Sequence, residues 1–294
     1  MTVLYHYCSI SALISIIESR SIWLSSLNLS TDSSEGKLVA DIIARISTSV
    51  GLDQASLKHV QNSVGYLEHI DQLFEVLGFC LSEEGDLLSQ WRGYASDATG
   101  FSIGFSKEYL ESLAETLEKQ GQQQFGLYKV EYQPMTQEAL VSPTFQKIKQ
   151  IIDGGGLKIP RVPGLLDERS DKEIEKEREN FEEAYKNMLT TVLELLSKLY
   201  TLKTQSFREE QEWRLISRLL RKGINGRIDP CSYRATNNRI VPFTKFNLIK
   251  LKEEPISEVI IGPKNLVPNY VVEKLLQQYN FNNVTVTRSR ATYR

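Results

Sequence analysis

The hydrophobic period changes along this chain, and that change limits the possible folds more than any other feature. Short segments with strand character, such as "GFCLS" at 78–82 and "SEVIIG" at 257–262, occupy the first and last thirds. The middle instead repeats apolar residues at helical spacing, most clearly over 165–200. Because side chains repeat with a period of two in strands and 3.6 in helices, the sequence predicts an α+β fold with strands towards both ends.

The N-terminal segment predicts a strand, a turn and a helix. The apolar opening "TVLYHY" is followed by isoleucine and leucine side chains at positions i, i+3, i+4 and i+7 from residue 10, behind a serine suited to capping. The segment 21–27 is predicted to be extended. Helical patterns follow over 35–77, where Ser33 or Ser34 is expected to cap a helix that starts near Glu35.

A helical insertion is predicted in the middle of the chain. A helix from Pro134 ends at the triple glycine 154–156, and two prolines in the next loop disfavour regular structure. The charge-rich helical pattern follows. We therefore predict three parts, which are an N-terminal half of the α+β core at 1–133, the insertion at 134–202 and a C-terminal half of the core at 203–294. Further strands are expected at 99–105, 125–132, 212–216, 239–243, 245–251 and 283–287, and a helix near 268–279.

Composition predicts an ordinary globular protein. The start of the chain lacks a secretory signal pattern and no segment has the length of a membrane span, so we expect a cytoplasmic protein that does not contact membranes. Three widely spaced cysteines suggest neither disulfides nor a zinc site. Residues 201–294 carry a net charge of +9 and residues 1–200 one of −11. This asymmetry permits a basic surface for phosphates or nucleic acid, or simple neutralisation across the fold.

Two N-terminal blocks contain residues suited to nucleotide binding. His6 lies between tyrosines at the end of a strand, where it can bind a ribose hydroxyl or have its nitrogens satisfied by backbone. In "LLSQWRGYASDA", Arg92 can hold a pyrophosphate, while Trp91 and Tyr94 can wall a pocket. Trp91 is equally well explained as a core anchor. The other histidines, at 59 and 69, lack carboxylates at ligand spacing, so no metal site is expected.

The segment "FREEQEWRLI" at 207–216 places carboxylates at the start of an apolar strand. In a strand, Glu210 and Glu212 would point to one side and Trp213 to the other. Such a pair can stabilise an oxocarbenium-like centre while orienting or deprotonating an incoming nucleophile. The alternative is a solvated turn in which these carboxylates pair with Arg208 and Arg214.

These blocks together resemble a widespread bacterial family of unknown function. The blocks are "YHYCS", "SIWLSSLN", "FCLSEEGDLLSQWRGYA", "FREEQEWRLI" and "VIIGPK", in that order and mostly outside the insertion. Within that family the layout resembles ADP-ribosyltransferases. The resemblance implies a split antiparallel β-sandwich with flanking helices and the helical insertion.

The resemblance also implies roles for individual residues. His6 would bind the adenosine-side ribose of NAD, and the backbone of Tyr7 would bind the nicotinamide amide, with Ser9 also at the NAD site. Glu212 would contact the nicotinamide ribose and carry catalysis, and Glu210 would position the acceptor. The middle motif stays open, because Trp91, Tyr94 or Ser102 could stack on nicotinamide or support the sheet. NAD would be a substrate, and no metal would be required.

The implied function is therefore transfer of ADP-ribose from NAD to a nucleic acid or protein, or hydrolysis of NAD on the same scaffold. Members of the resembling family often occur in bacterial toxin or anti-phage defence systems, which implies an antitoxin or inhibitor partner. Two alternatives from the residues remain. One is a non-catalytic nucleotide-binding or nucleic-acid-binding module in which Glu212 is structural, and the other is metal-dependent hydrolysis by the acidic groups at 209–212.

Overall fold

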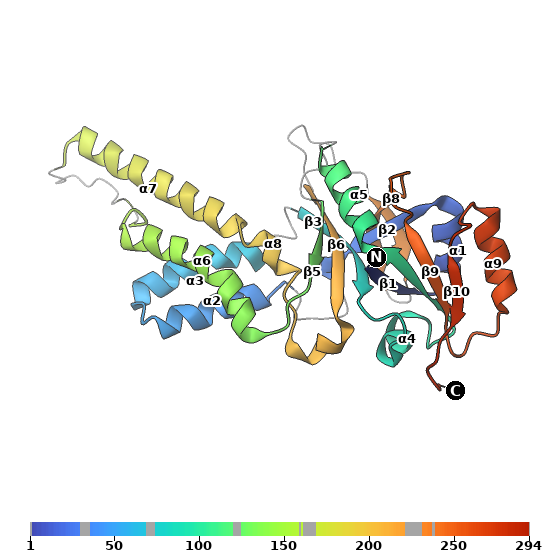
Figure 1. The fold of residues 1–294 in the computed structure, drawn as a ribbon. Helices are drawn as coiled ribbons and strands as arrows, with labels where there is room; N and C mark the ends of the chain where they lie inside the picture. Colours follow the sequence, from blue (N-terminus) through green and yellow to red (C-terminus); the bar gives the residue numbers. More distant parts are fainter. Residues whose placement is uncertain are drawn as a thin grey trace. The chain divides into compact units, whose positions relative to one another are not determined.

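The protein is described from a computed structural model of all 294 residues. The structure describes residues 2–29, 36–68, 74–119, 125–158, 160, 169–220, 231–236 and 239–293. The chain divides into two compact units (Figure 1). Unit 1 comprises Met1–Thr31, Leu73–Val130 and Ser206–Arg294, and unit 2 comprises Asp32–Gln72 and Glu131–Gln205. The predicted insertion 134–202 lies in unit 2, together with a segment that the sequence analysis had assigned to the core.

Unit 1 contains a mostly antiparallel ten-stranded sheet, in which β10 and β9 run parallel. Its strands are β1 Val3–Cys8, β2 Ser21–Ser26, β3 Phe74–Ser82, β4 Phe101–Ser106, β5 Gly126–Lys129, β6 Glu212–Leu220, β7 Ser232–Ala235, β8 Ile240–Asn247, β9 Ile256–Ile261 and β10 Thr285–Arg288. The main path follows the order β10-β9-β4-β1-β3-β2-β8-β7, and β6 pairs with both β3 and β5. The predicted α+β class is thus confirmed.

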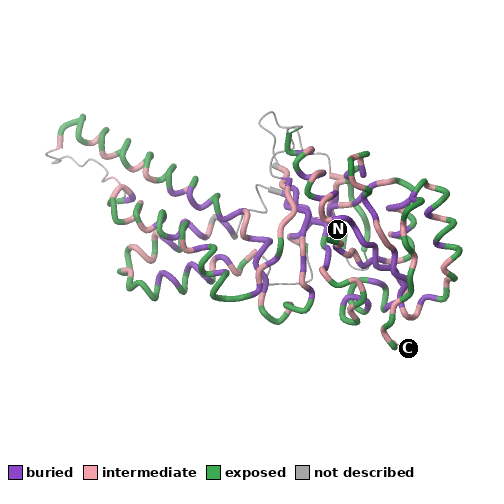
Figure 2. The backbone as a smooth tube through the Cα atoms, viewed as in Figure 1, coloured by how far each residue is buried: buried purple, intermediate pink, exposed green. Residues whose placement is uncertain are grey.

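The helices of unit 1 divide between the two faces of the sheet. They are α1 Ile10–Ser19, α4 Leu88–Tyr94, α5 Lys107–Lys119 and α9 Asn269–Gln278, with short helical turns η1 Leu27–Leu29 and η3 Gln205–Glu210 next to strands. Apolar residues of α1, α5 and α9 pack with Leu4, Ile103 and Phe79 of the strands in the main core. Trp91 of α4 packs instead with Tyr7 in a smaller cluster, which belongs to the opposite face by strand alternation. Figure 2 shows that many of the buried residues of unit 1 lie on the strands of the sheet.

Unit 2 is helical. Its helices are α2 Leu38–Ser49, α3 Gln54–Glu68, α6 Pro134–Asp153, α7 Asp171–Leu193 and α8 Leu196–Leu199. Helix α6 contacts α2 and α7, and its buried side Val141, Phe145 and Ile148 supplies much of the packing. No helix in the ranges described above is long and apolar enough to cross a membrane.

Most of the predicted helices and strands are present, and three predictions differ from the structure. Ser9 caps α1, since its hydroxyl accepts a hydrogen bond from the amide of Ala12 at 3.2 Å. The helical prediction over 35–77 is wrong at its end, because β3 starts at Phe74 and is paired along its length with β6. One strand, β8, replaces the two predicted at 239–251, and β7 was not predicted. The predicted caps at residues 33 and 34 lie outside the described residues.

Candidate functional site

The sheet of unit 1 has a gap along one edge of β3, because β1 and β2 pair with different parts of this strand. Strand β6 pairs with β3 over its whole length on the other edge. On the split edge, β1 pairs with β3 at Tyr5 and Ser82, whereas β2 pairs with β3 at Ser25–Gly78 and Ser26–Leu77. In the described part of the chain, Phe79–Leu81 therefore has no strand partner on this edge. The opening between β1 and β2 leaves backbone groups available to something other than a strand.

His6 lies at this opening. Its Nδ1 donates a hydrogen bond to the Cys80 carbonyl oxygen at 2.8 Å, and its ring stacks on Phe79 with the centroids 4.1 Å apart. Removal from water lowers the pKa of His6 to about 4, and the charge of Arg234 acts in the same direction, although the bond to Cys80 opposes both. The ring is therefore neutral near pH 7. Because Nδ1 carries the proton, Nε2 is an acceptor and can bind a hydroxyl group.

The lowered pKa of His6 makes stability depend on pH. Below the ordinary pKa near 6.5 the unfolded chain takes up a proton that the folded protein does not take up until about pH 4. Stability should therefore fall as pH drops from 6.5 to 4, by about 1–3 kcal/mol for a partly exposed ring. We expect His6→Gln to lack this component in denaturant unfolding followed between pH 4 and 7.

His59→Gln on α3 removes a histidine that lies outside this site and is the matched control. If His6→Gln shows the same pH dependence as His59→Gln, the proposed desolvation of His6 is wrong.

Tyr94, the last residue of α4, contacts Glu210, the first of the two predicted catalytic carboxylates. Its hydroxyl donates to Glu210 Oε1 at 3.1 Å, while the residue as a whole is 47% exposed. Removal of the hydroxyl from water, followed by the charges of Glu210 and Glu212, raises the pKa of Tyr94 above its usual value, so the hydroxyl stays protonated. An exposed aromatic ring is thus held beside two carboxylates. Such a surface can stack on a flat cationic ring.

The second carboxylate, Glu212, is held by an arginine on the same strand. Arg214 Nε donates to Glu212 Oε1 and its terminal nitrogen donates to Oε2, each at 2.8 Å. Both side chains are buried. The two residues are two positions apart on β6, so they lie on one face of the sheet. The sequence suggested a solvated pairing, but the structure places this pair out of water.

Glu210 does not lie on the strand, so the prediction that strand alternation aligns it with Glu212 is wrong. Glu210 ends η3, and Gln211 has a left-handed φ of 43° before β6 begins at Glu212. The backbone oxygen of Glu210 accepts from the Ser82 hydroxyl at 2.7 Å. The turn and this bond, rather than a strand period, bring the Glu210 carboxylate close to Tyr94.

Tyr7 lies next to His6 on β1, and Ser9 follows that strand as the N-cap of α1. Tyr7 is buried, and its hydroxyl donates to the Glu84 carbonyl oxygen at 2.7 Å and accepts from the Leu87 amide at 2.9 Å. Its backbone belongs to the part of β1 that faces the split. The Ser9 hydroxyl caps α1 and lies 3.0 Å from that of Ser11.

Trp91 and Arg92 lie away from the carboxylates. Trp91 is fully buried, meets Tyr7 edge to face and donates from Nε1 to Asp86 Oδ1 at 2.7 Å. Arg92 is exposed, with its guanidinium carbon 5.8 Å from the centre of the Tyr293 ring. This placement favours the interpretation of Trp91 as a core anchor for α4, which in turn positions Tyr94.

We expect Trp91→Phe to reduce stability while leaving Tyr94 in place. The phenyl ring keeps most of the apolar contact but loses the hydrogen bond to Asp86 and leaves a small cavity, which together cost about 1–2 kcal/mol. Thermal or denaturant unfolding measures the change. Tyr94→Phe, which removes a hydroxyl from a half-exposed ring on the same helix, should cost less. Equal stability losses in the two variants would contradict the anchor role of Trp91.

Sequence reasoning overlooked two contributors to this site. Arg214 was considered only as a surface partner, although the spacing Glu-x-Arg within a strand already indicates that the two side chains share a face. Cys80 is exposed on the same face, directly opposite Arg214 in the ladder. Its position opposite Arg214 depends on the pairing of β3 with β6, which no local sequence pattern shows.

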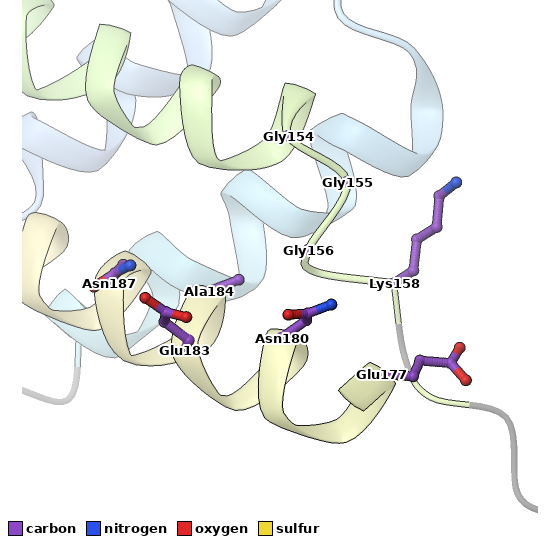
Figure 3. Close-up of a pocket in the computed structure, with 9 residues that line it drawn as sticks. All are labelled: Gly154, Gly155, Gly156, Lys158, Glu177, Asn180, Glu183, Ala184 and Asn187. Carbon is purple, nitrogen blue, oxygen red and sulfur yellow. The ribbon is translucent and has the colours of Figure 1, made fainter. Parts of the chain in front are cut away.

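Neither a metal cluster nor the cavity of unit 2 belongs to this site. Of the residues with described positions, no group of three or more His, Cys, Asp or Glu could hold a metal ion. A cavity of about 440 Å³ lies in unit 2 between the glycine turn after α6 and α7 (Figure 3). It is lined by Gly154, Gly155, Gly156, Lys158, Glu177, Asn180, Glu183, Ala184 and Asn187. None of the predicted site residues is among them.

A sequence model for the family described as "Protein of unknown function (DUF2971)" matches residues 90–215. The matched segment starts in α4 and ends in β6, so it includes Tyr94, Glu210 and Glu212. It also runs through the predicted insertion, and it covers less than half of the chain. No curated protein and no solved structure matches the chain.

Proposed function

We propose that unit 1 is an NAD-dependent ADP-ribosyltransferase, or an NAD glycohydrolase built on the same site. The observation that carries the proposal is the contact of α4 with the carboxylate segment at the start of β6, next to the strand that His6 contacts. Tyr94 of α4 donates to Glu210, which lies two residues before the buried Glu212 at the start of β6, and His6 of β1 bonds to Cys80 of β3, the strand that pairs with β6. The His6 ring lies on the same face of the sheet as Phe79, whereas Glu212 lies on the opposite face. A substrate would therefore lie within the opening in order to contact both His6 and Glu212.

The residues support cleavage of the bond between ribose C1′ and the nicotinamide nitrogen. When this bond breaks, its electron pair goes to the nicotinamide ring, which leaves neutral and needs no strong acid. Glu212 would stabilise the positive charge that develops on the ribose. Arg214 donates to both oxygens of this carboxylate at 2.8 Å, which fixes its orientation towards a bound ribose. Arg214 would keep the carboxylate charged and oriented.

The remaining groups fit the other parts of the reaction. The exposed Tyr94 ring can stack on nicotinamide, and the neutral His6 can accept from a ribose hydroxyl. An acceptor nucleophile would attack C1′ and lose its proton to Glu210, or water would do so in a glycohydrolase. These roles follow the family resemblance. We further propose that the protein acts as a bacterial toxin or anti-phage effector, held in check by an inhibitor protein.

The test is incubation with NAD labelled in its adenylate part, with and without bacterial lysate. Label that enters a macromolecule and is released by nuclease identifies a nucleic-acid acceptor, and release by protease identifies a protein acceptor. Label recovered as free ADP-ribose indicates a glycohydrolase. Label that stays in NAD under all conditions contradicts the proposal.

A second candidate is a binding module without catalysis. The observation that favours it is the Glu212–Arg214 pair, because a buried carboxylate with both oxygens bonded to a guanidinium also describes a structural ion pair. In this case the protein would bind a nucleotide or nucleic acid, and NAD would remain intact.

A further inference from the structure

The sheet face that carries Glu212 continues across the opening to β2, β8 and β7. Ser25 pairs with Gly78 of β3 on one side and with Phe243 of β8 on the other. Because directly paired residues point to the same face, the strand registers place four further side chains there. They are Trp23, Lys245, Val241 and Arg234. The strands β2, β3 and β8 can be followed in Figure 1.

Arg234 brings a positive charge to this face. Its terminal nitrogen donates to the Ser25 hydroxyl at 3.2 Å, so the guanidinium reaches across β8 to β2. The side chain is exposed, and no carboxylate pairs with it among the described residues. A guanidinium has five N–H donors, and Ser25 accepts only one of them.

Lys245 adds a second cation beside an aromatic pair. Its Nζ lies 5.2 Å from the centre of the Trp23 ring, and Trp23 stacks on Phe243 with centroids 4.4 Å apart at an interplanar angle of 20°. Lys245 is exposed, and it too has no carboxylate partner in the parts of the chain that are described. Arg234 and Lys245 thus place two positive charges on neighbouring strands of this face.

We propose that Arg234, with Ser25 and Lys245, binds the diphosphate of a nucleotide. This choice of occupant rests on the proposed function, because NAD carries a diphosphate between its two riboses. The chemistry matches, since a guanidinium donates to two phosphate oxygens at once and a serine hydroxyl can donate to a third. Arg234 thereby takes the pyrophosphate-binding role that the sequence suggested for Arg92, which lies instead beside Tyr293.

The test is calorimetric binding of ADP, inorganic pyrophosphate and a short single-stranded oligonucleotide at low ionic strength. ADP has no nicotinamide bond, so its binding does not require catalysis. We expect ADP and pyrophosphate to bind the wild-type protein, and Arg234→Gln to weaken both roughly tenfold. Lys245→Gln should weaken them less, because an ammonium acts as a single point charge. Arg178→Gln on α7 removes an exposed arginine elsewhere and should leave binding unchanged.

Two results would overturn this inference. One is ADP affinity that Arg234→Gln leaves as it is, or no ADP binding at all. The other is binding of the oligonucleotide alone, which would assign the cations to a nucleic-acid backbone instead. Loss of ADP binding in Arg234→Gln would support the inference even if the protein never consumed NAD, so the two proposals fail separately.

Discussion

Glu212→Gln is expected to lower nicotinamide release from NAD by about a thousandfold, because the variant loses the negative charge that stabilises the developing cation on the ribose. The amide keeps the size of the side chain and one oxygen that can accept from Arg214. The measurement is the initial rate of nicotinamide release by purified protein. If the protein is a toxin, expression of the wild type should slow bacterial growth, and the same substitution should relieve the effect.

The matched control for this variant is Glu209→Gln. Glu209 is the exposed neighbour of Glu210 in η3, so its substitution should leave the rate within a factor of about two. Because Glu212→Gln gives up one charged bond to Arg214, melting temperatures must be compared as well. A folded Glu212→Gln protein that releases nicotinamide at the wild-type rate would remove Glu212 from the mechanism.

Arg214→Met should be the most destabilising of the substitutions considered, by about 3–5 kcal/mol, because it removes the guanidinium that donates to both oxygens of the buried Glu212 carboxylate. The loss should shrink in acid, where the carboxylate can take up a proton and become neutral. Denaturant unfolding at pH 7 and pH 5 measures both effects.

The double variant Glu212→Gln with Arg214→Met separates the cost of the unpaired charge from the cost of lost packing. Replacing both members of a buried pair by uncharged groups is often close to neutral, so the double variant should recover most of the stability lost in Arg214→Met. If Arg214→Met alone costs less than about 1 kcal/mol, the pair is solvated and the burial described above is wrong.

Much of the fold could be predicted from local patterns, and the errors have physical reasons. Ser9 capped the predicted helix, and Pro134 began another, because capping and proline geometry act within a few residues. The start of β3 was missed because Leu73, Val76 and Leu77 stand at the helical spacing i, i+3 and i+4, with Glu75 between them. Strand β7 was missed because all four of its residues are exposed, so it has no two-residue alternation.

The candidate site was predictable as a set of residues but not as an arrangement. Glu210, Glu212 and Tyr94 were singled out by residue type, and the structure brings them together. The predicted alignment of Glu210 with Glu212 is wrong because Gln211 has a left-handed φ, which interrupts the two-residue strand alternation. No local sequence pattern predicts that turn. Arg234 could not be predicted, since its approach to Ser25, 209 positions away in the sequence, depends on the pairing of β8 with the distant strand β2.

The most direct test of NAD chemistry at this site is a time course of nicotinamide release by the purified wild-type protein, with Arg234→Gln measured alongside. We predict release that continues over many turnovers, with an apparent KM raised roughly tenfold in Arg234→Gln and a smaller change in kcat. NAD that remains intact in the presence of the wild-type protein and of bacterial lysate would contradict the proposed function and leave unit 1 as a binding module.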